Sequence, residues 1–173
     1  MRSHATIAAL VGAALTWTAT AVAQVPSTAV RTMNGVLTDS TVPSTNVPGT
    51  VPITYYLPKG YDAKRAALYP LLIQLHGRGS SNKAMENLMG GLLDQAIEKG
   101  LVPPMVSVMP STGPTFYMNF RDGSQKWEDF LMKDLLPYMR KNFHVVQGRE
   151  GTFITGISMG GMGSLRMHLF IAT

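Results

Sequence analysis

The stretch of sequence that decides the fold is GTFITGISMGGMG, at residues 151–163. Its first half is β-favouring and apolar, and it runs into GISMG at residues 156–160, a G-x-S-x-G pattern. This pattern is informative where a strand precedes the serine and a helix follows it, because the serine then lies on a sharp, strained turn. Flanking glycines let strand and helix approach closely. We predict a buried strand over residues 151–157, a helix after it, and Ser158 as a nucleophile.

Upstream of this segment, short apolar runs alternate with helical patterns of apolar residues at three- and four-residue steps. The helical pattern over residues 82–99 stops at Gly100, and a second helix has Asp122 or Ser124 as its candidate N-cap. Such alternation predicts an α/β fold, with a mostly parallel sheet and helices on both faces. The predicted strands lie at residues 51–57, 69–75, 105–109 and 151–157.

A second segment that could contribute to a catalytic site, HGRGSS at residues 76–81, follows the predicted strand over residues 69–75. A serine nucleophile that attacks a carbonyl needs N–H groups to stabilise the negative oxygen that develops. One donor is expected to be the backbone N–H of the residue after the serine, Met159, and the other an N–H from the loop after this strand. Within that loop the candidates are Gly77 and Arg78, with Arg78 preferred.

The first 23 residues have the features of a secretory signal peptide. Arg2 provides a positive start, residues 5–17 carry no Asp, Glu, Lys or Arg, and Ala21-Val22-Ala23 offers small residues for cleavage after Ala23. The apolar core is shorter than the ~20 residues of a membrane-spanning helix, although an uncleaved anchor is the alternative. We expect a signal peptide over residues 1–23, a flexible lead-in or edge strand over 24–48, and a secreted or periplasmic domain over 49–173.

Composition excludes several classes of protein. The chain has 173 residues, is 45% hydrophobic and contains no Cys, so it is neither a disordered chain nor a disulfide scaffold. The formal net charge of +5 comes from Lys and Arg that are scattered along the sequence. Without a basic cluster, a mildly basic surface is favoured over a nucleic-acid site, and no stable membrane span is expected.

Several segments together resemble the N-terminal part of a known family. The chain is similar to α/β-hydrolases of the "Putative esterase" group, which includes esterase D, feruloyl and acetylxylan esterases and the mycolyltransferases. The resemblance implies that Ser158 attacks a carboxylic ester and forms an acyl-enzyme, that Met159 N–H is an oxyanion donor, and that no metal or organic cofactor is needed. The matching segments are YLPKGY at 56–61, the strand into His76-Gly77, WEDF at 127–130, LLPY at 135–138, residues 142–149 and GISMGG at 156–161.

The resemblance breaks where the rest of a catalytic triad is expected. In this fold the acid and then the histidine follow the serine along the chain. After Ser158 there is no Asp or Glu, and His168 lies within the helix that leads away from the site. His144 and His76 precede the serine, and neither is assigned the role of base. We therefore expect a truncated, catalytically incomplete esterase domain that lacks its C-terminal strands, in preference to the alternative of a genuine short protein that lost activity.

Substrate contacts are expected from loops at the carboxyl ends of the strands, where such folds bind ligands. The expected substrate is a small-molecule or carbohydrate-linked ester, and the aromatic residues of these loops either stack on it or simply pack the loop. Two other functions stay open, namely an acyltransferase of the same fold and a non-catalytic module that binds carbohydrate or a partner. The candidate substrate-binding residues are Phe116, Tyr117, Asn119 and Arg121.

Overall fold

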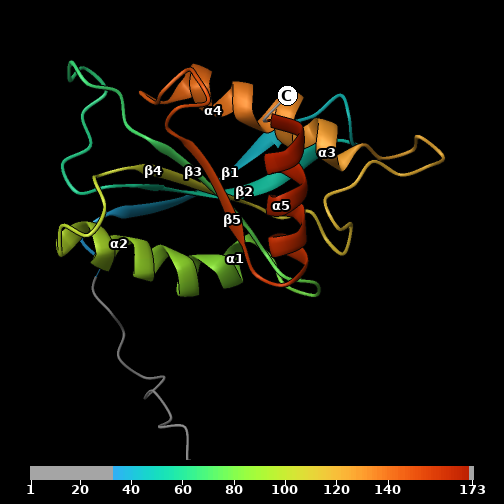
Figure 1. The fold of residues 1–173 in the computed structure, drawn as a ribbon, viewed down its shortest axis with the longest axis horizontal. Helices are drawn as coiled ribbons and strands as arrows, with labels where there is room; N and C mark the ends of the chain where they lie inside the picture. Colours follow the sequence, from blue (N-terminus) through green and yellow to red (C-terminus); the bar gives the residue numbers. More distant parts are fainter. Residues whose placement is uncertain (1–32, 172–173) are drawn as a thin grey trace, which may run out of the picture. The chain divides into compact units, whose positions relative to one another are not determined.

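A five-stranded sheet forms the centre of the chain in the computed structural model, which describes residues 33–171 (Figure 1). The predicted signal peptide lies outside the described residues. The strand order is β1-β2-β4-β3-β5, so the chain crosses the sheet before it reaches the strand that carries the serine motif. The strands are β1 (Val36–Pro43), β2 (Thr50–Leu57), β3 (Leu71–Leu75), β4 (Val106–Pro110) and β5 (Thr152–Gly156).

Strand pairing divides the sheet into two parts. β3 pairs in parallel with both β4 and β5, as predicted for this part of the chain. β1 and β2 are antiparallel, because the short turn over residues 44–49 cannot form the long crossover that parallel strands need. The sheet is therefore mixed, and the segment expected as lead-in or edge strand forms the edge strand β1.

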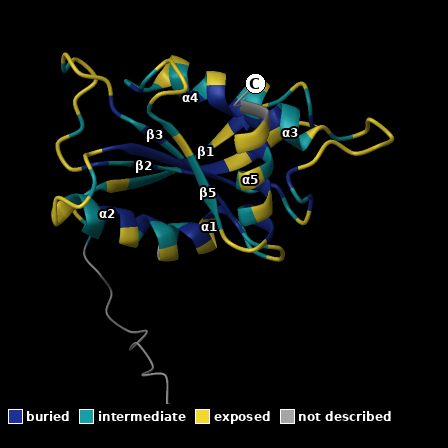
Figure 2. Cartoon of the chain, viewed as in Figure 1, coloured by how far each residue is buried: buried dark blue, intermediate teal, exposed yellow. Residues whose placement is uncertain are grey.

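Helices cover both faces of the sheet, and the buried strands lie between them (Figure 2). On one face, Met85 and Leu93 pack on Tyr56 of β2. On the other face, Phe130 and Met167 belong to the larger core cluster. No helix within residues 33–171 is long and apolar enough to cross a membrane. The first face is covered by α1 (Asn82–Met85), the π-helical η1 (Glu86–Gly90) and α2 (Gly91–Glu98), and the second by α3 (Trp127–Asp129), η2 (Phe130–Leu135), α4 (Leu136–Asn142) and α5 (Met159–Ile171).

The predicted start of the second helix is wrong. Asp122 accepts hydrogen bonds from the backbone N–H and hydroxyl of Ser124 within the preceding loop, and neither residue caps a helix. The helix begins at Trp127. Asn119, which precedes the helix by several residues, caps it. Its Oδ1 accepts the backbone N–H groups of Glu128 and Asp129 at 3.0 and 3.2 Å. A local capping pattern could not reveal this tertiary cap.

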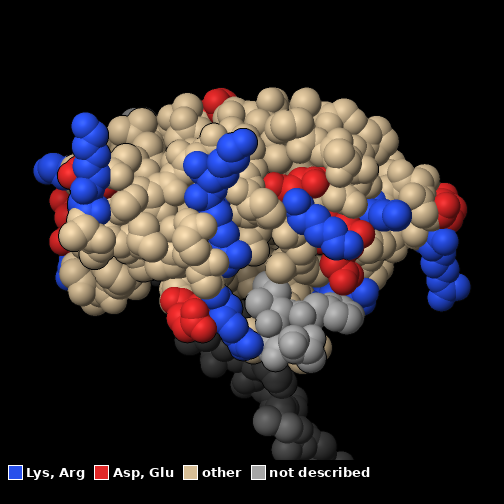
Figure 3. All heavy atoms as spheres, turned by 90° about the horizontal axis from the view of Figure 1, so that it is seen from above, with Lys and Arg blue, Asp and Glu red and all other residues tan. Residues whose placement is uncertain are grey.

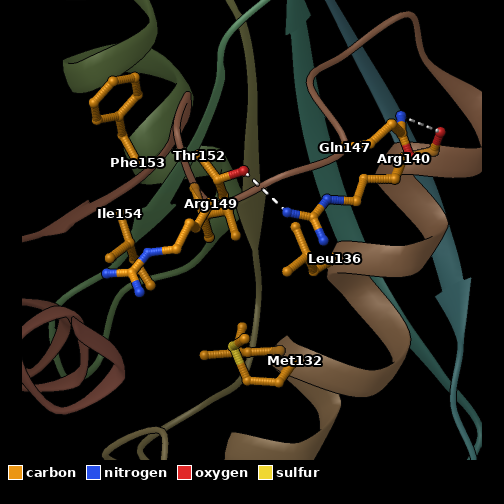
Figure 4. Close-up of a pocket in the computed structure, with 10 residues that line it drawn as sticks. Met132, Leu136, Arg140, Gln147, Arg149, Thr152, Phe153 and Ile154 are labelled. Atoms are coloured by element: carbon orange, nitrogen blue, oxygen red, sulfur yellow. Dashed lines mark hydrogen bonds between the residues drawn. The ribbon is translucent and has the colours of Figure 1, made fainter. Parts of the chain in front are cut away.

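The prediction of a buried strand at residues 151–157 is correct in its position but wrong in its burial. β5 lies at the edge of the sheet, and within residues 33–171 no strand pairs with its outer side. Phe153 is 52% exposed, and a groove of about 300 Å³ separates the strand from η2 and α4 (Figure 4). Arg140 of α4 crosses this groove and donates to Thr152 Oγ1 at 3.2 Å. On α5, which follows β5, further apolar side chains are exposed, namely Met162, Leu165 and Leu169.

A buried carboxylate anchors the start of β1. Asp94 of α2 accepts hydrogen bonds from the backbone N–H of Asn34 at 2.9 Å, that of Gly35 at 2.8 Å and the hydroxyl of Tyr56 at 2.8 Å. Burial alone would raise the pKa of Asp94, but the three donors outweigh burial and lower it. One charged side chain thereby connects the chain entering β1 with β2 and α2.

We predict that Asp94→Asn lowers the free energy of unfolding by about 1–3 kcal/mol at pH 7, because an amide cannot accept all three hydrogen bonds. The pKa of Asp94 is lower in the folded than in the unfolded chain, so its contribution is present above the unfolded pKa and disappears as the pH falls through the folded pKa. The difference in free energy of unfolding between the parent and Asp94→Asn should therefore shrink on acidification, as measured by urea unfolding at pH 7 and pH 3. Glu98→Gln, an exposed change on the same helix, is the control. Equal losses of unfolding free energy in Asp94→Asn and Glu98→Gln would contradict the stabilising role of Asp94.

We also predict that Phe153→Lys reduces self-association. An unpaired strand edge with an exposed apolar side chain invites pairing with another chain, and an edge lysine suppresses it. Sedimentation velocity across a concentration series should show less association for Phe153→Lys than for the parent chain. Phe120→Lys places the same charge on a loop residue that is 38% exposed, and should leave association unchanged. Equal effects of the two substitutions would show that charge alone, rather than the β5 edge, controls association.

Candidate active site

Ser158 lies on the tight turn between β5 and α5, exposed to solvent. Its backbone has φ +53°, a left-handed conformation that a non-glycine residue adopts at a cost. The turn is fixed by hydrogen bonds on both sides, from Ile157 N–H to the carbonyl of Leu75 at 3.2 Å and from Met162 N–H to the carbonyl of Ser158 at 3.1 Å. The serine is held at the N-terminus of α5, where the helix dipole favours negative charge.

Two glycines of the motif make this turn possible. A Cβ placed on Gly160 would lie 2.1 Å from the carbonyl oxygen of Leu75, and one placed on Gly156 would lie 2.4 Å from the carbonyl carbon of Gly160. Both distances are shorter than atoms tolerate, so no other residue fits without movement of the backbone. The first turn of α5 therefore packs directly on the end of β3.

The same packing brings the loop after β3 to the serine. A Cβ on Gly77 would lie 3.3 Å from the carbonyl oxygen of Ile157 and 3.7 Å from Cβ of Ser158. The N–H of Met159 belongs to the first turn of α5, where N–H groups have no acceptor within the helix. The N–H of Arg78 has no acceptor among the described residues. The structure thus places Gly77, which opens the predicted oxyanion loop, beside Ser158.

The residues predicted to bind substrate occupy different positions in the loop after β4. Tyr117 is fully buried, and its hydroxyl donates to the carbonyl of His76 at 2.9 Å. Burial raises its pKa above the usual range, so the phenol stays protonated and acts as a donor. Asn119 caps α3, as described above, while Phe116 is half-buried and Arg121 is exposed. Phe116 also packs against the larger core cluster, whereas Arg121 lies exposed on the loop.

No imidazole within residues 33–171 is placed to accept the proton of Ser158. Both ring nitrogens of His76 have backbone partners, and Nε2 of His144 lies 2.7 Å from the carbonyl of Arg65. His168 is exposed on α5, ten residues after Ser158, which corresponds to about 15 Å along the helix axis at 1.5 Å per residue. The side chain of Ser158 makes no hydrogen bond within the described part of the chain.

One carboxylate, that of Glu128, is held in an ion pair between two helices. Glu128, whose orientation the sequence does not decide, accepts a hydrogen bond from Nε of Arg166 at 2.8 Å and ties α3 to α5. On the face shown in Figure 3, basic and acidic side chains are interspersed. Residues 33–171 contain no group of three or more His, Asp or Glu that could hold a metal ion.

The sequence did not identify the supporting roles of Thr112 and Tyr117. Thr112 donates its backbone N–H to Nε2 of His76 at 3.1 Å, and for Tyr117 the sequence left open whether the ring stacks on substrate or packs the loop. A Cβ placed on Gly163 would lie 2.6 Å from the ring of Tyr117, so this ring also packs on α5. The sequence signal for this contact is the glycine at position 163, one turn after the motif glycine at 160.

Comparison with known proteins supports the esterase assignment. An esterase of Mycobacterium tuberculosis is 32% identical over 102 residues, which cover 57% of this chain and 22% of that protein. An acetyl esterase of Caldicellulosiruptor saccharolyticus is 36% identical over 61 residues, covering 35% of this chain and 23% of that protein. A ferulic acid esterase structure superposes with a TM-score of 0.67 at 26% identity, covering 77% of this chain and 53% of that one.

A more distant structure shares the fold. An S-formylglutathione hydrolase of Staphylococcus aureus superposes with a TM-score of 0.65 at 20% identity, over 80% of this chain and 53% of its own. The chain therefore spans about a fifth of the length of the curated relatives and about half of the solved structures. The model of the family described as "Putative esterase" matches residues 44–171, and the chain belongs to this family of the α/β-hydrolase fold.

Proposed function

We propose that this chain carries the nucleophile and oxyanion portion of a serine ester hydrolase. The observation that carries the proposal is the exposed Ser158 at φ +53°, held at the N-terminus of α5 with the Gly77 loop beside it. A strained, exposed serine with N–H groups available nearby is the arrangement used to attack an ester carbonyl and stabilise the resulting oxyanion.

In the proposed reaction, Ser158 Oγ attacks the ester carbonyl and gives a tetrahedral intermediate. The N–H groups of Met159 and Arg78 stabilise the negative oxygen of that intermediate. The alcohol then leaves, an acyl-enzyme forms on Ser158, and water attacks the acyl carbon to release the acid and regenerate the hydroxyl.

Proton transfer is the step that residues 33–171 do not supply. Neither an imidazole nor a carboxylate contacts Ser158 in the described structure, and a serine hydroxyl without a base is a poor nucleophile at neutral pH. The proposal is accordingly that this polypeptide alone turns over esters slowly, while Ser158 still reacts with strongly electrophilic probes.

Two observations support a proposed substrate class, the first from the relatives and the second from the loop after β4. The solved relative that is 26% identical to this chain, with a TM-score of 0.67, is a ferulic acid esterase. In this chain the loop after β4 carries the half-buried Phe116 and the exposed Phe120 and Arg121. An aromatic ring and a cation suit an ester of an aromatic acid, and we propose that class over purely aliphatic esters.

We predict that a fluorophosphonate probe modifies Ser158, and that Ser158→Ala abolishes the labelling. Ser164→Ala is the matched control, because Ser164 lies on the same helix with its hydroxyl bonded to the carbonyl of Gly160. Intact-mass and peptide mass spectrometry should show one adduct, located on Ser158, in the parent chain and in the control. Labelling elsewhere, or none in a folded sample, would contradict the proposed nucleophile. Robust turnover of p-nitrophenyl acetate that depends on Ser158 would contradict the proposed incompleteness.

We also propose that the protein is exported and cleaved after Ala23. Expression in a Gram-negative host with this leader should give a periplasmic product that begins at Gln24, as measured by N-terminal sequencing and intact mass. Ala23→Trp should block processing because the small-residue site is lost, whereas Ala29→Trp, beyond the junction, should not. A full-length product in the cytoplasm would contradict export.

A further inference from the structure

His76 occupies a buried position directly after β3, between the loop at Ser158 and the loop after β4. Its side chain is fully buried, and both ring nitrogens meet backbone groups. Nε2 lies 3.1 Å from the backbone nitrogen of Thr112, and Nδ1 lies 2.8 Å from the carbonyl oxygen of Gly77. His76 therefore has no free ring nitrogen for acid–base chemistry.

These two contacts define the tautomer of the ring. A backbone N–H can only donate, so Nε2 must present its lone pair to Thr112. A carbonyl oxygen can only accept, so Nδ1 must carry the hydrogen that points to Gly77. The only form of His76 that satisfies both contacts is the neutral imidazole protonated on Nδ1.

The hydrogen bond to Gly77 orients the peptide that follows it. The Gly77 carbonyl receives two donors, His76 Nδ1–H and the backbone N–H of Ser80 at 3.1 Å. In a trans peptide the carbonyl and the next N–H point in opposite directions, so the N–H of Arg78 is turned away from both donors. Gly77 itself lies against Ser158, and the N–H of Arg78 has no acceptor in the described structure.

Tyr117 holds the backbone of His76 in turn. Its hydroxyl donates to the His76 carbonyl at 2.9 Å, and the two rings meet edge to face with centroids 5.8 Å apart. Tyr117 and the preceding Phe116 both have positive φ, +55° and +54°, which non-glycine residues adopt only where surrounding contacts impose it. The strained pair thereby places a phenol under the oxyanion loop, with its ring packed on Gly163 of α5.

We propose that His76 is a positioning residue for the oxyanion site. Held by Thr112 and Tyr117, its Nδ1–H fixes the Gly77–Arg78 peptide so that the N–H of Arg78 faces the reacting oxygen. This inference rests on the proposed function of Ser158. It assigns the histidine a structural hydrogen bond that sets catalytic geometry, and it excludes the role of general base.

The two amide substitutions of His76 separate its two hydrogen bonds. In His76→Asn the side-chain amide occupies the place of Nδ1 and can still donate to Gly77, whereas in His76→Gln the amide reaches the place of Nε2 and the Nδ1 donor is lost. We expect the rate of fluorophosphonate labelling at Ser158 to stay within about threefold of the parent in His76→Asn. In His76→Gln it should fall by about 10²-fold, the loss typical of one oxyanion donor.

Four outcomes would overturn the inference. Equal labelling of His76→Gln and the parent, or equal losses in both variants that parallel their thermal stability, would show that the ring only packs the core. A long-range ¹H–¹⁵N spectrum of the parent that places the proton on Nε2, or on both nitrogens at pH 7, would contradict the tautomer whatever the labelling. Absence of labelling in the parent would instead remove the proposed function, and the positioning role with it.

Discussion

The contact between the first turn of α5 and the end of β3 is the constraint on which the site depends. Gly160 leaves no room for a Cβ against the carbonyl of Leu75, so helix and strand meet backbone to backbone. This contact forces Ser158 into its left-handed turn and brings the loop after β3 beside it. The proposed nucleophile and the proposed oxyanion loop therefore depend on the same packing contact, although about eighty residues separate them in the sequence.

The strain at the site is balanced by contacts that have no catalytic chemistry of their own. In the described part of the chain three non-glycine residues have positive φ, Phe116, Tyr117 and Ser158, and all three lie at or beneath the site. Each such residue costs on the order of 1–3 kcal/mol, so buried packing and hydrogen bonds must impose the conformation. Tyr117 provides both, because its ring lies against Gly163 and its hydroxyl against the backbone of His76.

The outer edge of β5 shows the opposite situation, an apolar surface that nothing in residues 33–171 covers. Its strand pairs on one side only, and the exposed Phe153 lies beside a groove bounded by α4. The chain also spans about half the length of the solved relatives, and within the described residues no acid or base contacts Ser158. This unpaired edge belongs to β5, the same strand that leads directly into Ser158.

The sequence by itself determined the class of fold and most element positions, and it predicted a candidate nucleophile and a candidate oxyanion loop, because glycine spacing and apolar periodicity are local properties. It predicted the wrong start for the helix at Trp127, because the cap comes from Asn119 in a separate loop. It treated β5 as buried, since an apolar run looks the same at an edge as in the centre of a sheet. Only the tertiary structure showed that Tyr117 and His76 support the site, because their roles depend on hydrogen bonds between residues far apart in the chain.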